Sequence, residues 1–306
     1  MLEILGKTRI DFIGKRNIAF AFSAALVGLG LLAAVQIDRG KANLGIDFAG
    51  GTAIQFKFDK PVRIDEARAA LEKNGVQGAE LQEFTEGNKL LVRVKAAKTI
   101  EEKVAERIRG ALSSAFPQNP FVVDSTTEIG PTIGKALQQT AVKAIVFSMI
   151  GIIIYIAFRF EFRFGIAAAV ATFHDVLAVL GVFYLLDKEI TLLIVSALLT
   201  LAGYSLTDTV VVFDRIRENL KTRRKESLIE TINNAINQVL SRTIVVSLTV
   251  MLVLIALFFF GGEVIHDFSF ALLIGVIVGT YSSIFVASPL LLYWKGKKGR
   301  LIHAVR

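Results

Sequence analysis

Six apolar stretches, each long enough to cross a lipid bilayer, constrain this chain more than any other feature of its sequence. About 20 residues of helix span the roughly 30 Å hydrocarbon core of a membrane, because a helix rises about 1.5 Å per residue. Hydrophobic residues make up 53% of the 306 residues, which is more than a soluble domain usually contains. The sequence therefore predicts six spanning helices, at Ile18 to Ile37, Ala141 to Phe158, Phe164 to Leu186, Ile190 to Phe213, Thr243 to Phe260 and Phe268 to Trp294.

Lysines and arginines are distributed unequally between the connecting segments. They precede the first span, follow the second, fourth and sixth, and are almost absent from the other two short turns. Because basic residues favour the cytoplasmic side, residues 1–17 and 295–306 are expected in the cytoplasm and residues 38–140 outside it. The net charge of +8 thus reflects membrane topology, and no basic stripe with stacking aromatics indicates a nucleic-acid partner. The first apolar run is too long for a signal peptide, so we expect an uncleaved span, 18–37.

The segment 38–140 has the residue periods of a folded domain. Strands are expected at 53–58, 80–84, 89–95 and 121–129, and helices at 64–73 and from Thr99 onward. This order is that of a ferredoxin-like sandwich. The predicted fold class is therefore an α-helical bundle of six transmembrane helices with one α+β ferredoxin-like domain between the first two. Gly50 and Gly51 lie in no phosphate-loop motif, so we expect a bulge or a close backbone contact there.

One ionisable side chain lies inside a stretch that otherwise belongs in hydrocarbon. Asp208 precedes Asp214 and Arg215 by about six residues, which places its carboxyl roughly 9 Å below the polar end of a continuous helix. A charged carboxyl there costs a few kcal/mol or more unless it is paired, protonated or beside water. Asp208 therefore marks a candidate proton pathway. Thr200 and Tyr204 precede it at four-residue spacing and predict a polar stripe directed at one neighbour.

Two further charged residues are candidates for the same proton-coupling site. Asp175 lies about 15 Å into the third span, where it either relays protons or makes a packing hydrogen bond. The adjacent His174 points to a different side of the helix, so the two form no metal site unaided, and we expect His174 to donate to another helix. Arg242 either anchors the fifth span or reaches Asp208, in which case pairing favours the charged carboxyl and separation favours the protonated one.

Local signals describe the remaining helices. Gly275, Gly279 and Ser283 recur every four residues in the sixth span and let helices pack backbone to backbone. Ser227 and Glu230 predict a capping box within a cytoplasmic amphipathic segment, 214–240, whose helix rests on the membrane surface or against the bundle. The chain has no cysteine, which excludes disulfides and thiolate metal sites, and we expect no metal and no cofactor.

Six motifs occur in a particular order along almost the whole chain. They are GIDFAGG (Gly45 to Gly51), FHDV (Phe173 to Val176), GYSLTDTVVVFDRIREN (Gly203 to Asn219), SRT (Ser241 to Thr243), FGGE (Phe260 to Glu263) and GVIVGTYSSIFVASP (Gly275 to Pro289). Each is weak by itself, but the set resembles the SecF family of the bacterial protein-translocation accessory complex, within the RND superfamily. The first motif supplies candidate extracytoplasmic residues, namely Gly45, Asp47, Gly50 and Gly51.

The resemblance implies a non-enzymatic subunit of the bacterial inner membrane that pairs with SecD and works beside the SecYEG channel. YajC and SecA are further candidate partners, a translocating preprotein is the substrate, and H⁺ is the expected coupling ion. By motif position, the family's proton-linked aspartate falls on Asp208 and its arginine on Arg242. Two positions depart from the family pattern. Thr207 replaces a frequent Asn, and Val246 replaces a frequent Thr, while the adjacent Ser247 lies on a different helical face. Thr207 and Ser247 complete the predicted polar seam.

Three other functions stay open at this point. An RND-type exporter of small molecules or lipids usually carries twelve spans in one chain, so six spans argue against it. An intramembrane aspartyl protease could use Asp175 and Asp208, but the GxGD signature is absent and the two acids are expected at different depths. In a purely structural subunit, the same polar residues would only join helices.

Overall fold

The computed structural model describes residues 8–84, 87–95, 104–222 and 226–294. Within these residues the chain forms two compact units. A helical unit contains the described residues up to Asn43, Ala144–Lys188 and those from Leu193 onward. A sheet unit contains Leu44–Lys143 together with the short segment Glu189–Leu192.

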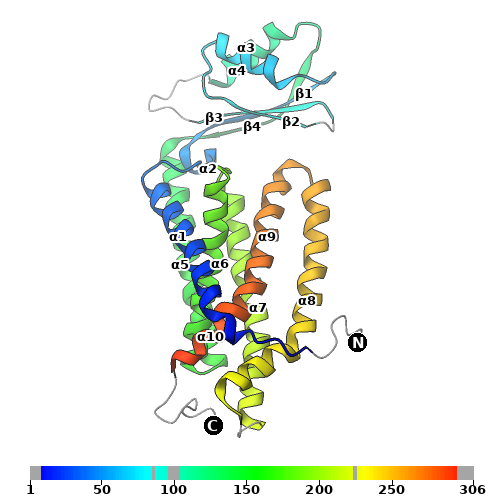
Figure 1. Ribbon diagram of the computed structural model, residues 1–306. Helices are drawn as coiled ribbons and strands as arrows, with labels where there is room; N and C mark the ends of the chain where they lie inside the picture. The colour runs from blue at the N-terminus through cyan, green and yellow to red at the C-terminus, as the bar shows by residue number, and fades with distance from the viewer. Residues whose placement is uncertain (1–7, 85–86, 96–103, 223–225, 295–306) are drawn as a thin grey trace. The chain divides into compact units, whose positions relative to one another are not determined.

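Among the described residues, six helices are long and apolar enough to cross a membrane, which confirms the predicted number of spans. They carry outward-facing apolar side chains such as Phe147, Leu252 and Phe259, as expected for helices whose solvent is lipid. After α9 the chain continues through a π-helical turn (Ser283–Ala287), α10 (Ser288–Leu290) and a final 3₁₀ turn (Leu291–Trp294). The spanning helices are α1 (Arg16–Asp38), α5 (Pro131–Arg159), α6 (Phe162–Leu185), α7 (Leu192–Thr222), α8 (Leu228–Phe260) and α9 (Gly262–Ser282) (Figure 1).

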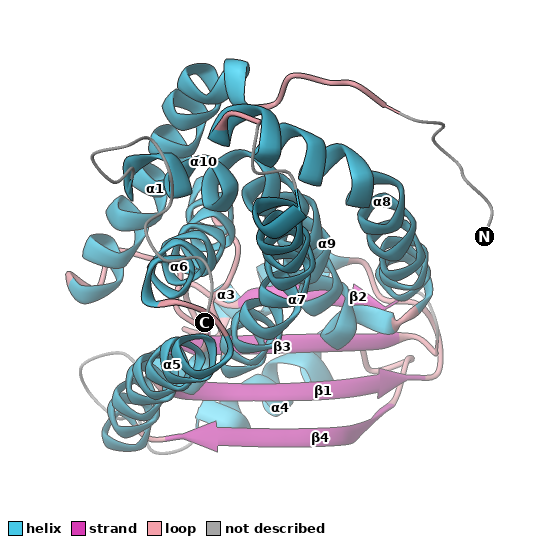
Figure 2. Cartoon of the chain, turned by 90° about the horizontal axis from the view of Figure 1, so that it is seen from below, coloured by secondary structure: helices cyan, strands magenta, loops and turns pink. Residues whose placement is uncertain are grey.

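Helices α1 and α6 approach closely because glycines lie at their contact. A Cβ atom at Gly30 of α1 would lie 2.2 Å from the carbonyl oxygen of Leu177, and one at Gly181 of α6 would lie 2.8 Å from the Gly30 nitrogen. Figure 2 shows the two helices side by side. Small residues permit such direct backbone packing in membranes, so this contact depends on the absence of side chains at both positions.

Helix α8 is longer than the predicted fifth span. The side chain of Ser227 accepts a hydrogen bond from the Glu230 N–H while the Glu230 carboxylate binds the Ser227 N–H, which confirms the capping box. We expected a separate amphipathic helix before the span, but α8 runs without a break for 33 residues. Its first half has no Gly or Pro to interrupt it, and its apolar side packs in one cluster with Ile13 and Ile216. It therefore lies against the bundle.

The sheet unit has the predicted order of elements. It contains β1 (Gly51–Phe58), α3 (Ile64–Lys73), β2 (Glu80–Phe84), β3 (Lys89–Lys95), α4 (Val104–Ala115) and β4 (Phe121–Ile129), after a one-turn helix α2 (Ile46–Ala49). The strands lie in the order β2-β3-β1-β4 with antiparallel neighbours, as Figure 2 shows. The ferredoxin-like prediction is confirmed, while Thr99 lies outside the described residues.

Alternation along the strands separates an apolar face from a polar one. Ile54, Phe56 and Val92 are buried with side chains of α3 and α4, which cover one face of the sheet (Figure 1). On the opposite face the Lys89 Nζ atom lies 2.7 Å from Asp124 Oδ2. The Lys89 ammonium donates this hydrogen bond and holds the pKa of the Asp124 carboxyl below its ordinary value. The polar face is thus organised by an ion pair between β3 and β4.

We expect Lys89→Gln to return the pKa of Asp124 toward its ordinary value of 3.8. A carboxyl whose pKa is lowered by folding stabilises the fold above its unfolded pKa, and this contribution disappears as the pH falls through the folded pKa. The variant should therefore lose stability at pH 7 and lose less below about pH 4. Urea unfolding of the full chain, followed by hydrogen exchange in β1 and β3, measures this. Arg63→Gln removes only exposed ion pairs and serves as control. If Lys89→Gln lowered the free energy of unfolding equally at both pH values, the ion pair between Lys89 and Asp124 would be contradicted.

The two glycines of the GIDFAGG motif have backbone conformations that side chains disfavour. Gly50 has φ +77° and Gly51 has φ +145°, and a Cβ at Gly51 would lie 2.3 Å from the Val94 carbonyl oxygen of β3. Glycine adopts such angles without steric cost. Residue 51 therefore needs glycine both for its conformation and for its approach to the neighbouring strand.

Candidate functional site

Asp208 lies in the second half of α7 and is only 5% exposed. Its Oδ2 atom accepts a long hydrogen bond, 3.4 Å, from Ser247 Oγ of α8, and Ser247 Oγ lies 2.7 Å from Thr280 Oγ1 of α9. A hydroxyl group has one proton to donate, so when Ser247 donates to Asp208, Thr280 donates to Ser247. These three side chains, called the hydroxyl line below, join the acid to two neighbouring helices.

Ser247, and not Val246, provides the contact from α8. Val246 is 39% exposed and points out of the bundle, whereas Ser247 is 5% exposed. Consecutive helical residues point in directions about 100° apart. Position 246, where the family frequently has Thr, and Ser247 therefore lie on different faces of α8. In this chain the face of Ser247 is the one directed at Asp208.

The polar stripe of α7 is only partly directed at one neighbour. Tyr204 is half-buried, and its hydroxyl makes no hydrogen bond with the described part of the chain, although the charge of Asp208 acts on it. Thr200 and Thr207 are exposed and donate to backbone carbonyls one turn earlier on their own helix, at 2.8 and 3.3 Å. These two threonines therefore face lipid or another subunit, while Tyr204 stays beside the acid.

Arg242 does not form an ion pair with Asp208. Its side chain is exposed on α8, and it has no salt bridge or hydrogen bond with any residue that the structure describes. Its positive charge nevertheless acts on the Asp208 carboxyl through space. The direct contact between Arg242 and Asp208 that was considered from the sequence is thus not formed among the described residues.

Asp175 is fully buried on α6 and binds hydroxyl groups of two other helices. Its Oδ2 atom accepts hydrogen bonds from Ser205 of α7 and from Ser282 of α9, the latter at 2.8 Å. Hydrogen bonds of this kind hold transmembrane helices together. Asp175 therefore joins three helices, whether or not it also exchanges protons.

His174 does not donate to another helix. Its Nδ1 atom lies 2.8 Å from Asp175 Oδ1 on the same helix, and its Nε2 atom is buried without a partner among the described residues. The expectation of an interhelical donor is therefore wrong. Rotation about the side-chain torsions lets neighbouring side chains meet, even though their Cα–Cβ bonds point in different directions.

The small residues of α9 lie against α7. A Cβ at Gly275 would lie 2.5 Å from Leu201 Cδ1, and one at Gly279 would lie 3.1 Å from Ser205 Cβ. Ser283 is buried and begins the π-helical turn. This close approach places the hydroxyl groups of α9 within reach of both acids.

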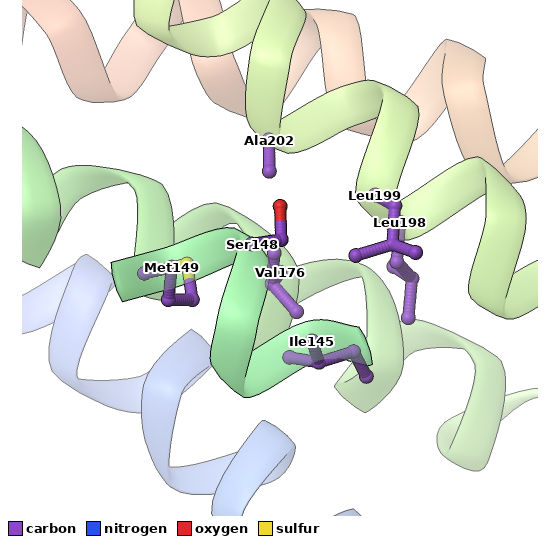
Figure 3. A pocket seen from close by; sticks show the side chains of 7 residues that line it. All are labelled: Ile145, Ser148, Met149, Val176, Leu198, Leu199 and Ala202. Atoms are coloured by element: carbon purple, nitrogen blue, oxygen red, sulfur yellow. The ribbon is translucent and has the colours of Figure 1, made fainter. Parts of the chain in front are cut away.

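Two further features of the structure were considered as functional sites, namely metal-binding groups and a pocket between helices. No group of three or more metal-binding side chains occurs in the part of the chain that is described. Figure 3 shows a pocket between α5, α6 and α7 whose lining is apolar apart from one serine and contains no titratable side chain. Its lining residues are Ile145, Ser148, Met149, Val176, Leu198, Leu199 and Ala202.

The two acids do not form a protease dyad. Asp175 and Asp208 bind different hydroxyl groups, and no hydrogen bond joins their carboxyls among the described side chains. Aspartic proteases need two carboxyls about 3 Å apart that share one proton. The arrangement of the acids therefore argues against proteolysis.

Sequence reasoning missed three residues of these networks. Ser205, Thr280 and Ser282 lie within the motifs, but single hydroxyl residues are common in spanning helices and give no signal of their own. Ser205 lies three residues before Asp208, a spacing that places both on one side of α7 and could have indicated it.

Two family models match this chain. The model described as "Protein export membrane protein SecD/SecF, C-terminal" matches residues 110–297, and the one described as "SecD/SecF GG Motif" matches residues 42–62. The first match contains both acids and their hydroxyl partners. The second contains the GIDFAGG motif.

Known proteins resemble the chain over nearly its whole length. The protein translocase subunit SecF of Thermodesulfovibrio yellowstonii is 54% identical over 294 residues, which cover 95% of this chain and 97% of that protein. The SecF subunit of Endomicrobium trichonymphae is 43% identical, with 95% and 93% covered. The crystal structure of SecDF from Thermus thermophilus superposes with a TM-score of 0.78 at 38% identity, covering 94% of this chain but only 39% of that longer chain.

Six helices long enough to span a membrane and a ferredoxin-like insert after the first describe a multi-pass membrane protein, and the identity to protein translocase subunits makes it a transport subunit of the inner membrane. The matched family model covers more than half of the residues, and the identity to translocase subunits extends over almost all of them. The chain belongs to the SecF family of protein translocase subunits.

Proposed function

We propose that this chain acts with a SecD subunit beside the SecYEG channel and uses the proton-motive force to promote the translocation or release of preproteins. It carries no enzymatic activity of its own in this proposal. The observation that supports it most directly is Asp208, a carboxyl buried within a spanning helix and joined to hydroxyl groups of two others. A buried ionisable side chain is costly in a membrane and usually serves transport.

The proposed cycle begins when Asp208 accepts a proton from the outer side. Protonation removes the attraction between its charge and that of Arg242, whose exposed guanidinium then interacts with the SecD partner. The resulting shift of α7 and α8 moves the sheet unit, which acts on the emerging polypeptide. Asp175 is a second candidate for protonation, and Tyr204 supports the site from the same helix as Asp208.

The free energy available from one proton bounds what this cycle can do. One elementary charge that crosses 100 mV releases about 2.3 kcal/mol, enough to shift a two-state equilibrium by roughly fifty-fold. A nearly complete reversal needs about 5.5 kcal/mol. A single proton can therefore bias the motion, and a full stroke needs more than one proton or a larger potential.

The proposed orientation follows from the charges of the connecting segments. Both termini and the polar ends of α7 and α8 lie in the cytoplasm, and the sheet unit lies outside it, because lysines and arginines concentrate on the inner side. The SecDF chain of Thermus thermophilus supports SecD as the partner. YajC and SecA complete the proposed set of partners.

Export into reconstituted vesicles tests the proposal. Vesicles contain SecYEG and a SecD partner, with or without this chain, and preprotein translocation is measured with and without a proton gradient. Stimulation by the gradient should require this chain and should vanish with a proton ionophore, while a sodium ionophore leaves it unchanged. If vesicles without the chain respond equally to the gradient, the proposal is rejected; loss with the sodium ionophore alone would assign Na⁺ instead of H⁺.

A further inference from the structure

Four residues, called the link (Glu189–Leu192), run from the turn after α6 to the first residue of α7 and belong to the sheet unit. Ile190 pairs with Leu44 in a parallel β-bridge, and its carbonyl accepts a hydrogen bond of 2.9 Å from the Gly45 N–H. A Cβ at Gly45 would lie 2.8 Å from Thr191 Cγ2. The link therefore packs directly on the first glycine of the GIDFAGG motif, although some 140 residues separate them in sequence.

Two charged side chains of the sheet unit contact the ends of the link. Asp47 Oδ2 accepts a hydrogen bond of 2.9 Å from the N–H of Leu192, which is the first residue of α7. A carboxylate at the start of a helix can accept a hydrogen bond from a backbone N–H of the first turn, and it interacts favourably with the helix dipole. At the other end, Arg93 Nη1 of β3 lies 3.2 Å from Glu189 Oε2. The helix that carries Asp208 thus begins at a cap supplied by the motif.

The positive charge of Arg93 compensates the negative charge of Glu189, a carboxylate that is mostly buried. The Glu189 side chain is 11% exposed, and its second oxygen is buried without a hydrogen bond among the described residues. Burial raises the pKa of Glu189, and the charge of Arg93 opposes this shift. Glu80, Lys95 and Asp47 also face it. Removing one partner of a buried pair leaves the other charge uncompensated, so Arg93→Gln should loosen the link.

We propose that Asp47 and Arg93 are positioning residues that keep the link attached to the sheet unit throughout the transport cycle, so that α7 drives the sheet unit through it. This inference rests on the proposed function, because the proposed proton site lies on α7. The residues touch neither the proton nor the preprotein. Their role is to prevent the helix from moving without the domain.

The absence of cysteine in the chain allows a covalent test. Bridge partners in neighbouring strands lie about 4.8 Å apart, within the range that a disulfide accepts, so Leu44→Cys and Ile190→Cys together can bond the link to the motif. Gradient-dependent export is measured in oxidised and reduced vesicles for this pair alone and for the pair combined with Arg93→Gln. The fraction of bonded thiols is measured by alkylation and mass spectrometry, with and without the gradient.

We expect the oxidised pair to export as well as the reduced pair. Arg93→Gln should lose most gradient-dependent export when reduced and regain it when oxidised, because the bond replaces the lost ion pair. A protein that is merely misfolded would not respond to oxidation in this way. Lys89→Gln breaks a comparable ion pair on the same strand and should export normally. Arg93→Lys retains the charge and should show an intermediate loss.

Three results would overturn the inference. They are normal export by reduced Arg93→Gln, inactivation of the otherwise unchanged chain by the disulfide, and failure of oxidation to restore Arg93→Gln. Failure of the proposed function has a different signature. If Asp208→Asn keeps its response to the gradient, the proton site is misassigned, while the alkylation measurement still shows whether the link stays attached.

Discussion

Asp208→Asn should assemble normally and lose the part of preprotein export that depends on the proton gradient. Asparagine has nearly the same shape and can still accept the hydrogen bond of Ser247 through its carbonyl oxygen, so the packing of α7, α8 and α9 should be retained. The amide cannot bind and release a proton. In the unchanged protein, one proton moving through 100 mV can stimulate export by at most roughly fifty-fold. In Asp208→Asn, the proton gradient should not stimulate export at all.

A matched acid on the same helix provides the control. Asp214 is partly exposed and pairs with Arg159 at 3.1 Å, so Asp214→Asn changes the same charge on α7 without touching the hydroxyl line. It should keep its response to the gradient. Arg242→Lys keeps a charge at the exposed position and should retain part of the response. Undiminished stimulation in Asp208→Asn would reject the assignment of the proton site and leave a structural polar seam.

Gly30→Leu should have the largest effect on stability in the helical unit. A Cβ at this position would lie 2.2 Å from a carbonyl oxygen of α6, and a backbone atom cannot move aside as a flexible side chain can. Helices α1 and α6 would have to separate, and overpacking typically costs about 1–3 kcal/mol, with larger values where the backbone itself must move. We expect a lower yield in membranes and a lower unfolding temperature in detergent.

Gly28→Leu is the control for this prediction, because it makes the same change two residues earlier on α1. Gly28 is exposed, and a Cβ there would meet no atom within 4 Å. This variant should unfold at nearly the temperature of the unchanged protein, since leucine is a better helix former than glycine. If Gly30→Leu and Gly28→Leu lowered the unfolding temperature equally, the close approach of α6 to Gly30 would not be the cause of the destabilisation.

Much of the fold follows from local sequence patterns. The alternation of the strands and the capping box of Ser227 and Glu230 are local signals, and the structure has these elements where they are expected. The full length of α8 did not follow, because its amphipathic first half and its apolar second half were expected as two separate helices, whereas the structure joins them in one helix of 33 residues. Hydropathy alone cannot distinguish a span from a helix that continues beyond the membrane.

The candidate site was only partly predictable. Asp208 stands out because an acid in an apolar run is rare, but its partners Ser247 and Thr280 come from helices 39 residues and more away in sequence. The pairing of Arg93 with Glu189 was missed for the same reason, since ion pairs between distant segments leave no periodic pattern. Such contacts depend on how the helices and strands pack, which a single sequence does not show.

The hydroxyl line has a consequence for how quickly the protein can sense a proton. While Asp208 is ionised it can only accept, so the O–H dipoles of Ser247 and Thr280 both point toward it. A protonated Asp208 can donate instead, and then both dipoles can reverse by rotation about single bonds while the heavy atoms stay in place. The arrival of one hydrogen ion on α7 would thereby change the local field at α8 and α9 within the time of a hydroxyl rotation, long before any helix has moved.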